Sequence, residues 1–126
     1  MNTEFDFKGS TILIAEDEED NYLLLEAFLE ATGAEILHAR NGEELLTMVE
    51  NNNNIDLILM DIKMPGINGM EATTKIKEAH PDMPVIAQTA YAMQNEKTEI
   101  LKAGCDSILT KPLIESTVLN TISKYL

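Results

Sequence analysis

The residues of this chain with the clearest chemical potential are polar side chains that directly follow short apolar runs. They are Glu16, Asp17, Asp61, Thr89 and Lys111. Each run has the length of a β-strand, and the carboxyl ends of parallel strands meet at one edge of a sheet, where open α/β folds bind their ligands. We therefore expect three carboxylates, a hydroxyl and an ammonium group to converge at that edge.

Such a cluster suits phosphoryl chemistry with a metal ion. Three crowded carboxylates repel one another, which raises the pKa of at least one of them, and a divalent cation relieves the repulsion. Oxygen ligands without Cys or clustered His favour magnesium over zinc. Magnesium held by few carboxylates also invites phosphate oxygens, for which Lys111 and Thr89 supply partners. An Asp carboxylate can itself act as a nucleophile and form an acyl phosphate, and the metal and Lys111 would neutralise charge on the transferring phosphoryl group.

Each of these residues also has an ordinary structural interpretation. Asp61 can be a turn residue after a strand, Lys111 a surface lysine and Thr89 a strand-end hydroxyl. The acids at 18–20 suit the first turn of a helix, where the dipole favours negative charge. What favours a functional site is that the candidates fall on successive strand ends.

Strand-length and helix-length segments alternate along the chain. The expected strands are 11–15, 35–38, 57–60, 84–88 and 107–110. Apolar spacing predicts helices that end near Thr32, begin after Asn41, run from Gly69 to Ala79, run from Asn95 to Ala103, and include Val118 to Ile122. Asn41 and Asn68 are expected to cap two of these helices. Repeated β-α units predict a parallel sheet with helices on both faces.

The pattern also predicts whether several single residues are buried or exposed. Ile100 and Leu101 are expected to face the core from their helix. Cys105 is expected to be a small packed residue before the last strand. His38 and His80 are expected on the surface, away from the strand-end edge.

Length and composition narrow the class of protein. The 126 residues suit one domain, and 44% hydrophobic residues are enough for a core. The net charge of −13 argues against direct binding to nucleic acid or to an anionic membrane. One cysteine excludes an intramolecular disulfide. No apolar run has membrane-spanning length and no signal peptide is evident, so we expect a cytoplasmic domain. Residues 1–10 are expected to be a linker or tail before a domain at 11–126.

Together these motifs resemble the receiver domain of two-component signalling. The matching segments, in order, are Leu13-Ile14-Ala15-Glu16-Asp17, Met60-Asp61-Ile62-Lys63-Met64-Pro65, Gln88-Thr89-Ala90 and Thr110-Lys111-Pro112. The resemblance spans about residues 11–126 and is closest to receivers of hybrid sensor histidine kinases. It implies a CheY-like, flavodoxin-like (βα)5 fold with sheet order 2-1-3-4-5.

The resemblance implies a metal site and a phosphoacceptor. Asp61 would take a phosphoryl group from a phosphohistidine. Asp17, Asp61 and the backbone carbonyl of Lys63 would bind Mg²⁺ directly, and Glu16 would act through a bound water.

It also implies how the domain switches. Lys111 would pair with the acidic cluster and the phosphoryl group, and Thr89 would turn inward on phosphorylation. The Lys111–Pro112 peptide bond would be cis.

Two positions depart from the family pattern. Ile108 stands where a rotating Tyr or Phe is frequent, so switching would rely on Thr89 and loop movement, with Tyr91 as a partner contact. Ile114 stands where a polar helix cap is usual, so the last helix would start loosely or bury Ile114 against a neighbour.

The expected function is therefore a phosphoacceptor that switches partner binding and hydrolyses its phosphoryl group slowly. The donor would be a histidine kinase or a histidine phosphotransfer domain. The chain would belong to a hybrid sensor histidine kinase, which would itself be an enzyme, or would be a stand-alone response regulator; a weak homodimer stays open. One alternative is a Mg²⁺ phosphatase with an Asp nucleophile, although haloacid dehalogenase enzymes carry that residue on the first strand. Another is a receiver fold that only binds partners.

Overall fold

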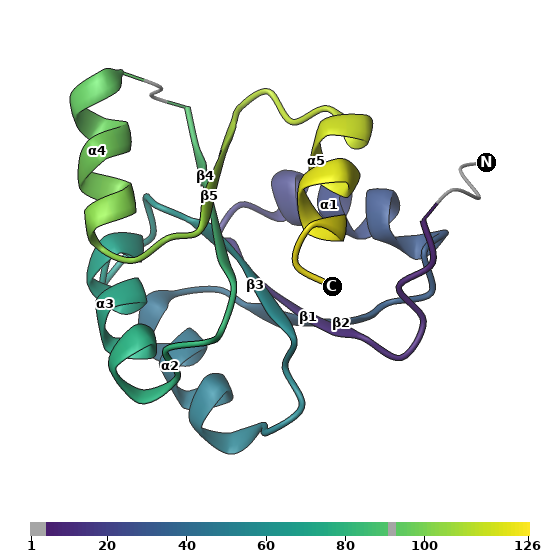
Figure 1. Ribbon diagram of the computed structural model, residues 1–126, viewed down its shortest axis with the longest axis horizontal. Helices are drawn as coiled ribbons and strands as arrows, with labels where there is room; N and C mark the ends of the chain where they lie inside the picture. Colours follow the sequence, from purple (N-terminus) through teal and green to yellow (C-terminus); the bar gives the residue numbers. More distant parts are fainter. Residues whose placement is uncertain (1–4, 91–92) are drawn as a thin grey trace.

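Strands and helices alternate through the residues that the computed structural model describes, 5–90 and 93–126 (Figure 1). In chain order they are β1 (Thr11–Ala15), α1 (Glu19–Glu30), β2 (Glu35–Ala39), α2 (Gly42–Asn51), β3 (Leu57–Asp61), α3 (Gly69–Ala79), β4 (Val85–Thr89), α4 (Gln94–Lys102), β5 (Ser107–Thr110) and α5 (Glu115–Ser123). The strands form one sheet in the order β2-β1-β3-β4-β5, and all neighbouring pairs are parallel. The predicted flavodoxin-like (βα)5 fold and sheet order are confirmed.

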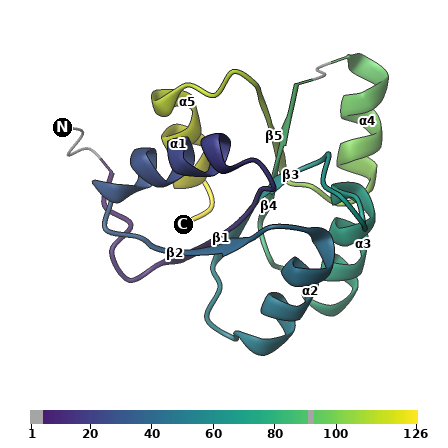
Figure 2. The same cartoon turned by 180° about the vertical axis from the view of Figure 1, so that it is seen from behind.

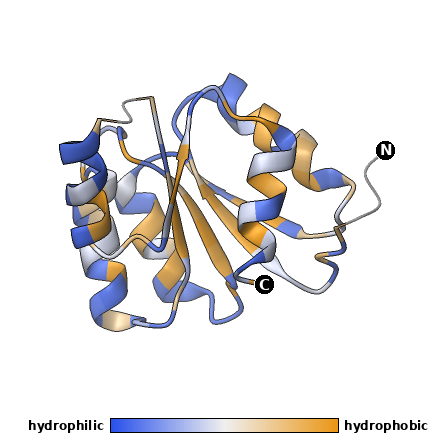
Figure 3. Ribbon diagram, turned by 45° about the horizontal axis from the view of Figure 1, so that its top comes forward, coloured by the Kyte–Doolittle hydropathy of each residue, from blue (hydrophilic) through white to orange (hydrophobic). Residues whose placement is uncertain are grey.

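The sheet is the middle layer of three. Helices α1 and α5 cover one face, and α2, α3 and α4 cover the other (Figures 1 and 2). Along β3, Ile58 and Met60 contribute to the core under α2–α4, while Leu57 and Leu59 contribute to the core under α1 and α5. Burial on both faces explains why the run is continuously apolar. Figure 3 shows the apolar strands at the centre and mixed hydropathy on the surrounding helices.

Two helices begin at the asparagine caps predicted from the sequence. The side chain of Asn41 accepts a hydrogen bond from the backbone N–H of Glu44 at 2.8 Å, and Asn68 accepts one from the N–H of Glu71 at 2.9 Å. Each bond satisfies a donor that the first helical turn leaves without an intrahelical partner. The starts of α2 and α3 are thereby defined.

Glycines at these same helix starts allow close backbone packing. A Cβ at Gly69 would lie 2.8 Å from the Cα of Ile62 and 2.9 Å from the carbonyl oxygen of Asp61. A Cβ at Gly42 would lie 2.3 Å from the carbonyl oxygen of Ile67. The first turns of α2 and α3 therefore pack directly on the segment that follows β3, and this packing positions the loop after Asp61.

One expectation about apolar side chains is wrong, and another is narrowed to one of its two alternatives. Ile100 is fully buried, but Leu101 is 51% exposed, because residues one apart on a helix point about 100° apart and α4 buries only a narrow stripe. Ile114 is the N-cap of α5, is 61% exposed and makes no side-chain cap bond, so of its two expected alternatives the loose helix start fits and burial against a neighbour does not. Cys105 is buried as expected.

The segment before β1 contacts the domain. Phe7 is buried in the core under α1 and α5, and its N–H donates to the carbonyl of Thr32 at 2.8 Å. A boundary at residue 10 between a lead-in and the domain stays a prediction. Within the described ranges, none of the helices combines the length and apolar character needed to cross a bilayer.

Candidate functional site

Three acidic side chains meet at the carboxyl ends of β1 and β3. One carboxylate oxygen from each of Glu16, Asp17 and Asp61 lies within 4.8 Å of the other two. Neighbouring strands explain the convergence, because Ala15 pairs with Met60 and the acids come directly after these residues. Glu16 and Asp61 are buried, whereas Asp17 is exposed. The predicted acidic cluster thus exists in the fold.

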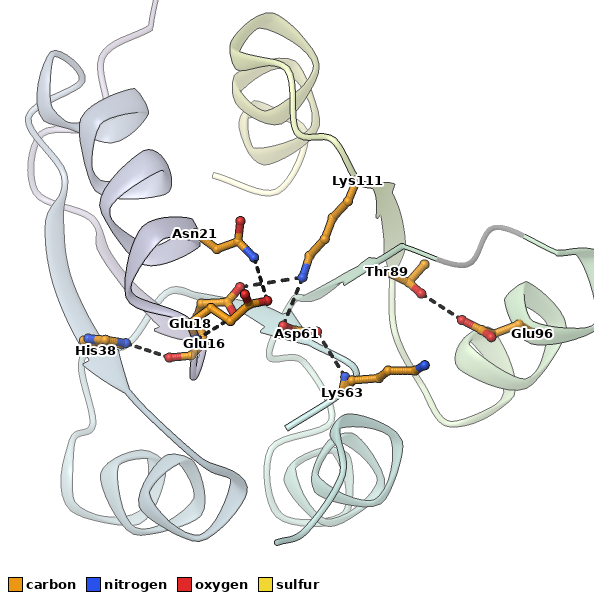
Figure 4. A network of polar contacts seen from close by, with 9 residues as sticks. All are labelled: Glu16, Glu18, Asn21, His38, Asp61, Lys63, Thr89, Glu96 and Lys111. Atoms are coloured by element: carbon orange, nitrogen blue, oxygen red, sulfur yellow. Dashed lines mark hydrogen bonds and ion pairs between the residues drawn. The ribbon is translucent and has the colours of Figure 1, made fainter. Parts of the chain in front are cut away.

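Lys111 brings a positive charge to this cluster. Its Nζ lies 3.1 Å from Oδ2 of Asp61 and 4.0 Å from Oε1 of Glu16 (Figure 4). Lys111 follows β5, which is separated from β3 by β4, so the long side chain reaches past one strand to the acids. The Lys111–Pro112 bond is cis, as the family resemblance implies.

Both oxygens of the Asp61 carboxylate have defined partners. Oδ1 accepts the backbone N–H of Lys63 at 3.0 Å, and Oδ2 accepts the Lys111 ammonium. The Asp61 side chain is only 5% exposed. These contacts hold the carboxylate in one orientation, which is what a nucleophile needs for productive attack.

The Glu16 carboxyl is the group in the site for which ionisation is least favourable. Burial, followed by the proximity of Asp61, raises the pKa of Glu16 from an ordinary 4.5 to about 8, against the opposing effects of the Glu18 N–H and Lys111. Its Oε1 atom is buried and has no hydrogen-bond partner within the described part of the chain. A divalent cation among these oxygens would supply the missing partner and lower the repulsion, so the residues present fit a metal ion that prefers oxygen ligands.

The Thr89 hydroxyl does not join the cluster in this structure. It donates instead to Oε1 of Glu96 on α4 at 2.8 Å and is directed away from Asp61 (Figure 4). The expectation that the hydroxyl converges with the acids is therefore wrong for this conformation, because a charged acceptor on α4 competes for it. Tyr91 lies outside the described residues, and Ile108 packs against the core under α2–α4.

Sequence reasoning misplaced His38. Its Nε2 lies 2.8 Å from the carbonyl oxygen of Glu16, and its ring stacks on Tyr22, so His38 is at the site and not away from it. The signal was available: His38 belongs to a parallel strand whose carboxyl end reaches the same edge. Glu96 was also missed, and its position in the first turn of α4 was the corresponding signal.

A groove of about 620 Å³ opens beside the acidic cluster. Asp17 and residues of α4, including Glu96, line it. Met64, Met70 and Met93 add flexible apolar lining. The site is therefore accessible from one side even though Asp61 itself is almost covered.

A doubly wound parallel α/β fold with carboxylates at the ends of β1 and β3 and a lysine after β5 defines a class of signalling domain. The sequence profile of the response regulator receiver domain matches residues 12–123, and the chain belongs to this family. It is a receiver domain of two-component signalling. Such domains interact with histidine kinases or phosphotransfer partners.

Relatives of two kinds share this domain. The chain is 34% identical over 123 residues to the sensor histidine kinase GacS of Pseudomonas protegens, covering 94% of this chain but 13% of the kinase. It is 37% identical over 118 residues to the polar-differentiation response regulator DivK of Brucella anthropi, covering 92% of this chain and 95% of DivK. Homologues thus include receivers inside much longer kinases and stand-alone regulators.

Solved structures agree on the fold. The receiver domain of sensor histidine kinase PA1611 from Pseudomonas aeruginosa superposes with a TM-score of 0.85 at 30% identity over 93% of this chain and 97% of that one. That structure has a magnesium ion coordinated in its active-site cleft. The chemotaxis protein CheY4 of Vibrio cholerae has a TM-score of 0.86 at 24% identity, covering 93% and 98% of the two chains.

Proposed function

We propose that Asp61 accepts a phosphoryl group from a phosphohistidine of a histidine kinase or a histidine phosphotransfer domain. The observation that carries this proposal is the Asp61 carboxylate fixed between the Lys63 N–H and the Lys111 ammonium, beside two further acids. An Asp61 oxygen forms the new P–O bond as the P–N bond of the donor breaks, and the imidazole keeps the electron pair. The Lys111 ammonium then neutralises charge on the phosphoryl oxygens.

The proposed metal is Mg²⁺, held by Asp17, Asp61 and the backbone carbonyl of Lys63, with Glu16 acting through a water. When bound, it would neutralise phosphoryl oxygens that three carboxylates would otherwise repel. The all-oxygen ligand set supports this choice, and so does Oε1 of Glu16, which lacks a hydrogen-bond partner among the described residues. The coordinated magnesium in the PA1611 receiver supports it independently.

Phosphorylation is proposed to act on α4 through Thr89. Its hydroxyl leaves Glu96 to bind a phosphoryl oxygen, which releases the first turn of α4. Ile108 lacks the planar ring that rotates in many receivers, so Thr89 and its loop carry the change. The output face would include α4, β5 and α5.

Donor docking is proposed beside the site, on α1. Leu23 and Leu24 are 48% and 39% exposed on this helix, which directly follows the acidic loop. Apolar side chains exposed next to a reaction site suit a transient helical partner.

The proposed context is a cytoplasmic receiver, residues 11–126, within a hybrid sensor histidine kinase; a stand-alone regulator is the alternative. A charge of −13 disfavours direct nucleic-acid binding, and a weak homodimer is compatible with the exposed faces. A Mg²⁺ phosphatase is disfavoured because the candidate nucleophile, Asp61, is the last residue of β3 and does not lie on β1.

The test is intact mass after incubation with acetyl phosphate, with and without Mg²⁺. Wild type should gain one phosphoryl group only with Mg²⁺, Asp61→Asn should gain none, and the matched exposed-site variant Asp82→Asn should behave as wild type. Absence of both adduct and released phosphate would overturn the proposal. Sustained hydrolysis of p-nitrophenyl phosphate would instead support the phosphatase.

A further inference from the structure

The loop that carries Asp17 is fastened to β2 at Glu16. The backbone N–H of Glu16 donates to the carbonyl of Ala39 at 2.9 Å, and the backbone carbonyl of Glu16 lies 2.8 Å from Nε2 of His38 (Figure 4). Because a carbonyl can only accept, Nε2 of His38 carries the proton of this bond. Both backbone polar groups of Glu16 are thus bound to one strand, directly before the exposed ligand Asp17.

The same imidazole makes a second contact with a residue that follows Asp17 in the sequence. Its ring stacks on Tyr22 of α1, with ring centroids 3.7 Å apart and an interplanar angle of 5°. The Tyr22 hydroxyl donates to Oε2 of Glu26 at 3.0 Å, which fixes the phenol ring on the helix. His38 therefore touches the chain at residues 16 and 22, and Asp17 lies between these two contacts.

We propose that His38 is a positioning residue for the metal site. Its hydrogen bond to Glu16 holds the β1–α1 loop so that the Asp17 carboxylate stays near those of Glu16 and Asp61 before the cation arrives. Of the three acids Asp17 alone is exposed, so burial does not restrict its position. The loop backbone must therefore hold it in place. A loop already in place spares the cation the entropy cost of ordering it. This inference rests on the proposed Mg²⁺ site.

The test compares Mg²⁺ affinity by isothermal titration calorimetry for wild type and for variants that separate the two contacts. His38→Phe keeps a ring to stack on Tyr22 but removes the donor, and should weaken Mg²⁺ binding about 2- to 10-fold, the range set by the net free energy of one hydrogen bond. His38→Gln carries an N–H donor at a similar reach and should recover part of that loss. His80→Phe changes the other, exposed histidine in the same way and should bind Mg²⁺ as wild type does.

A second readout separates positioning from a general loss of structure. At saturating Mg²⁺, His38→Phe should accept a phosphoryl group from acetyl phosphate at the wild-type rate, because Asp61 and Lys111 are unchanged. Wild-type Mg²⁺ affinity in a folded His38→Phe variant would overturn the inference, and so would an equal loss in His80→Phe. A rate defect that persists at saturating Mg²⁺ would overturn it as well. Absence of Mg²⁺ binding by wild type would instead overturn the proposed metal site itself.

Discussion

Replacing Glu16 with glutamine should stabilise the metal-free protein near neutral pH. Glu16 is fully buried, and burial beside Asp61 raises its pKa to about 8. Below about pH 4.5 the carboxyl is neutral in both the folded and unfolded states. As the pH rises from there through 8, the unfolded state releases this proton first, so the free energy of unfolding falls. Glutamine has nearly the same shape but no charge, so it should remove this loss.

The pKa change sets the size of the effect. At pH 7 only the interval between 4.5 and 7 counts, because the folded carboxyl still holds its proton there; at 1.36 kcal/mol per pH unit, keeping that proton costs the folded state about 3 kcal/mol. This is an upper bound, because the glutamine amide places a second donor beside the Lys111 ammonium, 4.0 Å from Oε1, and a buried donor that lacks an acceptor costs free energy. We therefore expect a gain of about 2–3 kcal/mol at pH 7, which corresponds to about 10 °C in Tm for a domain of this size.

The assay is thermal unfolding followed by circular dichroism at pH 5, 7 and 8 in the presence of EDTA. Glu35→Gln, at an exposed position on β2, is the matched control and should leave Tm within about 1 °C of wild type, because surface substitutions rarely matter more. With Mg²⁺ at 100 times its Kd, wild type should gain about 2.7 kcal/mol and the Glu16 variant less. If Glu16→Gln is no more stable than wild type at pH 7 and 8, or shows the same slope with pH, the reasoning is refuted.

Three further substitutions probe other parts of the structure. Lys111→Met should bind Mg²⁺ several-fold more tightly in a titration, because the cation no longer competes with an ammonium 3.1 Å from Asp61. The same variant should accept phosphoryl groups more slowly. Weaker Mg²⁺ binding than in wild type would contradict the expected competition. Glu96→Ala should speed phosphorylation by acetyl phosphate about 2- to 10-fold in a mass-spectrometric time course, because the Thr89 hydroxyl loses the acceptor that holds it outward. A slower reaction would count against that role of Glu96. Gly42→Ala should lower the free energy of unfolding, measured by urea denaturation, by about 1–3 kcal/mol, because its Cβ would meet a backbone carbonyl that cannot move aside. An unchanged urea midpoint would show instead that the helix shifts freely.

Much of the fold could be predicted from local patterns alone. Continuous apolar runs such as 57–60 indicate strands buried on both faces, and the asparagine caps mark where helices begin. Repeated β-α units then leave few topologies, because crossovers are right-handed and all strand ends of a parallel sheet share an edge. That is why the meeting of Glu16, Asp17 and Asp61 could be expected before any coordinates were known.

What the tertiary structure alone decided concerns contacts between elements. Periodicity states which face of an element a residue occupies, but not how wide the covered stripe is, and so Leu101 was misplaced. It also does not choose among competing partners: the Thr89 hydroxyl pairs with Glu96 on α4 and not with the acidic cluster. His38 reaches the Glu16 carbonyl only because β2 lies beside β1, a neighbour relation set by the packing of the whole sheet. Hydrogen bonds between distant segments depend on ångström-scale placement and on rotamer choice, which residue types along the chain do not encode individually.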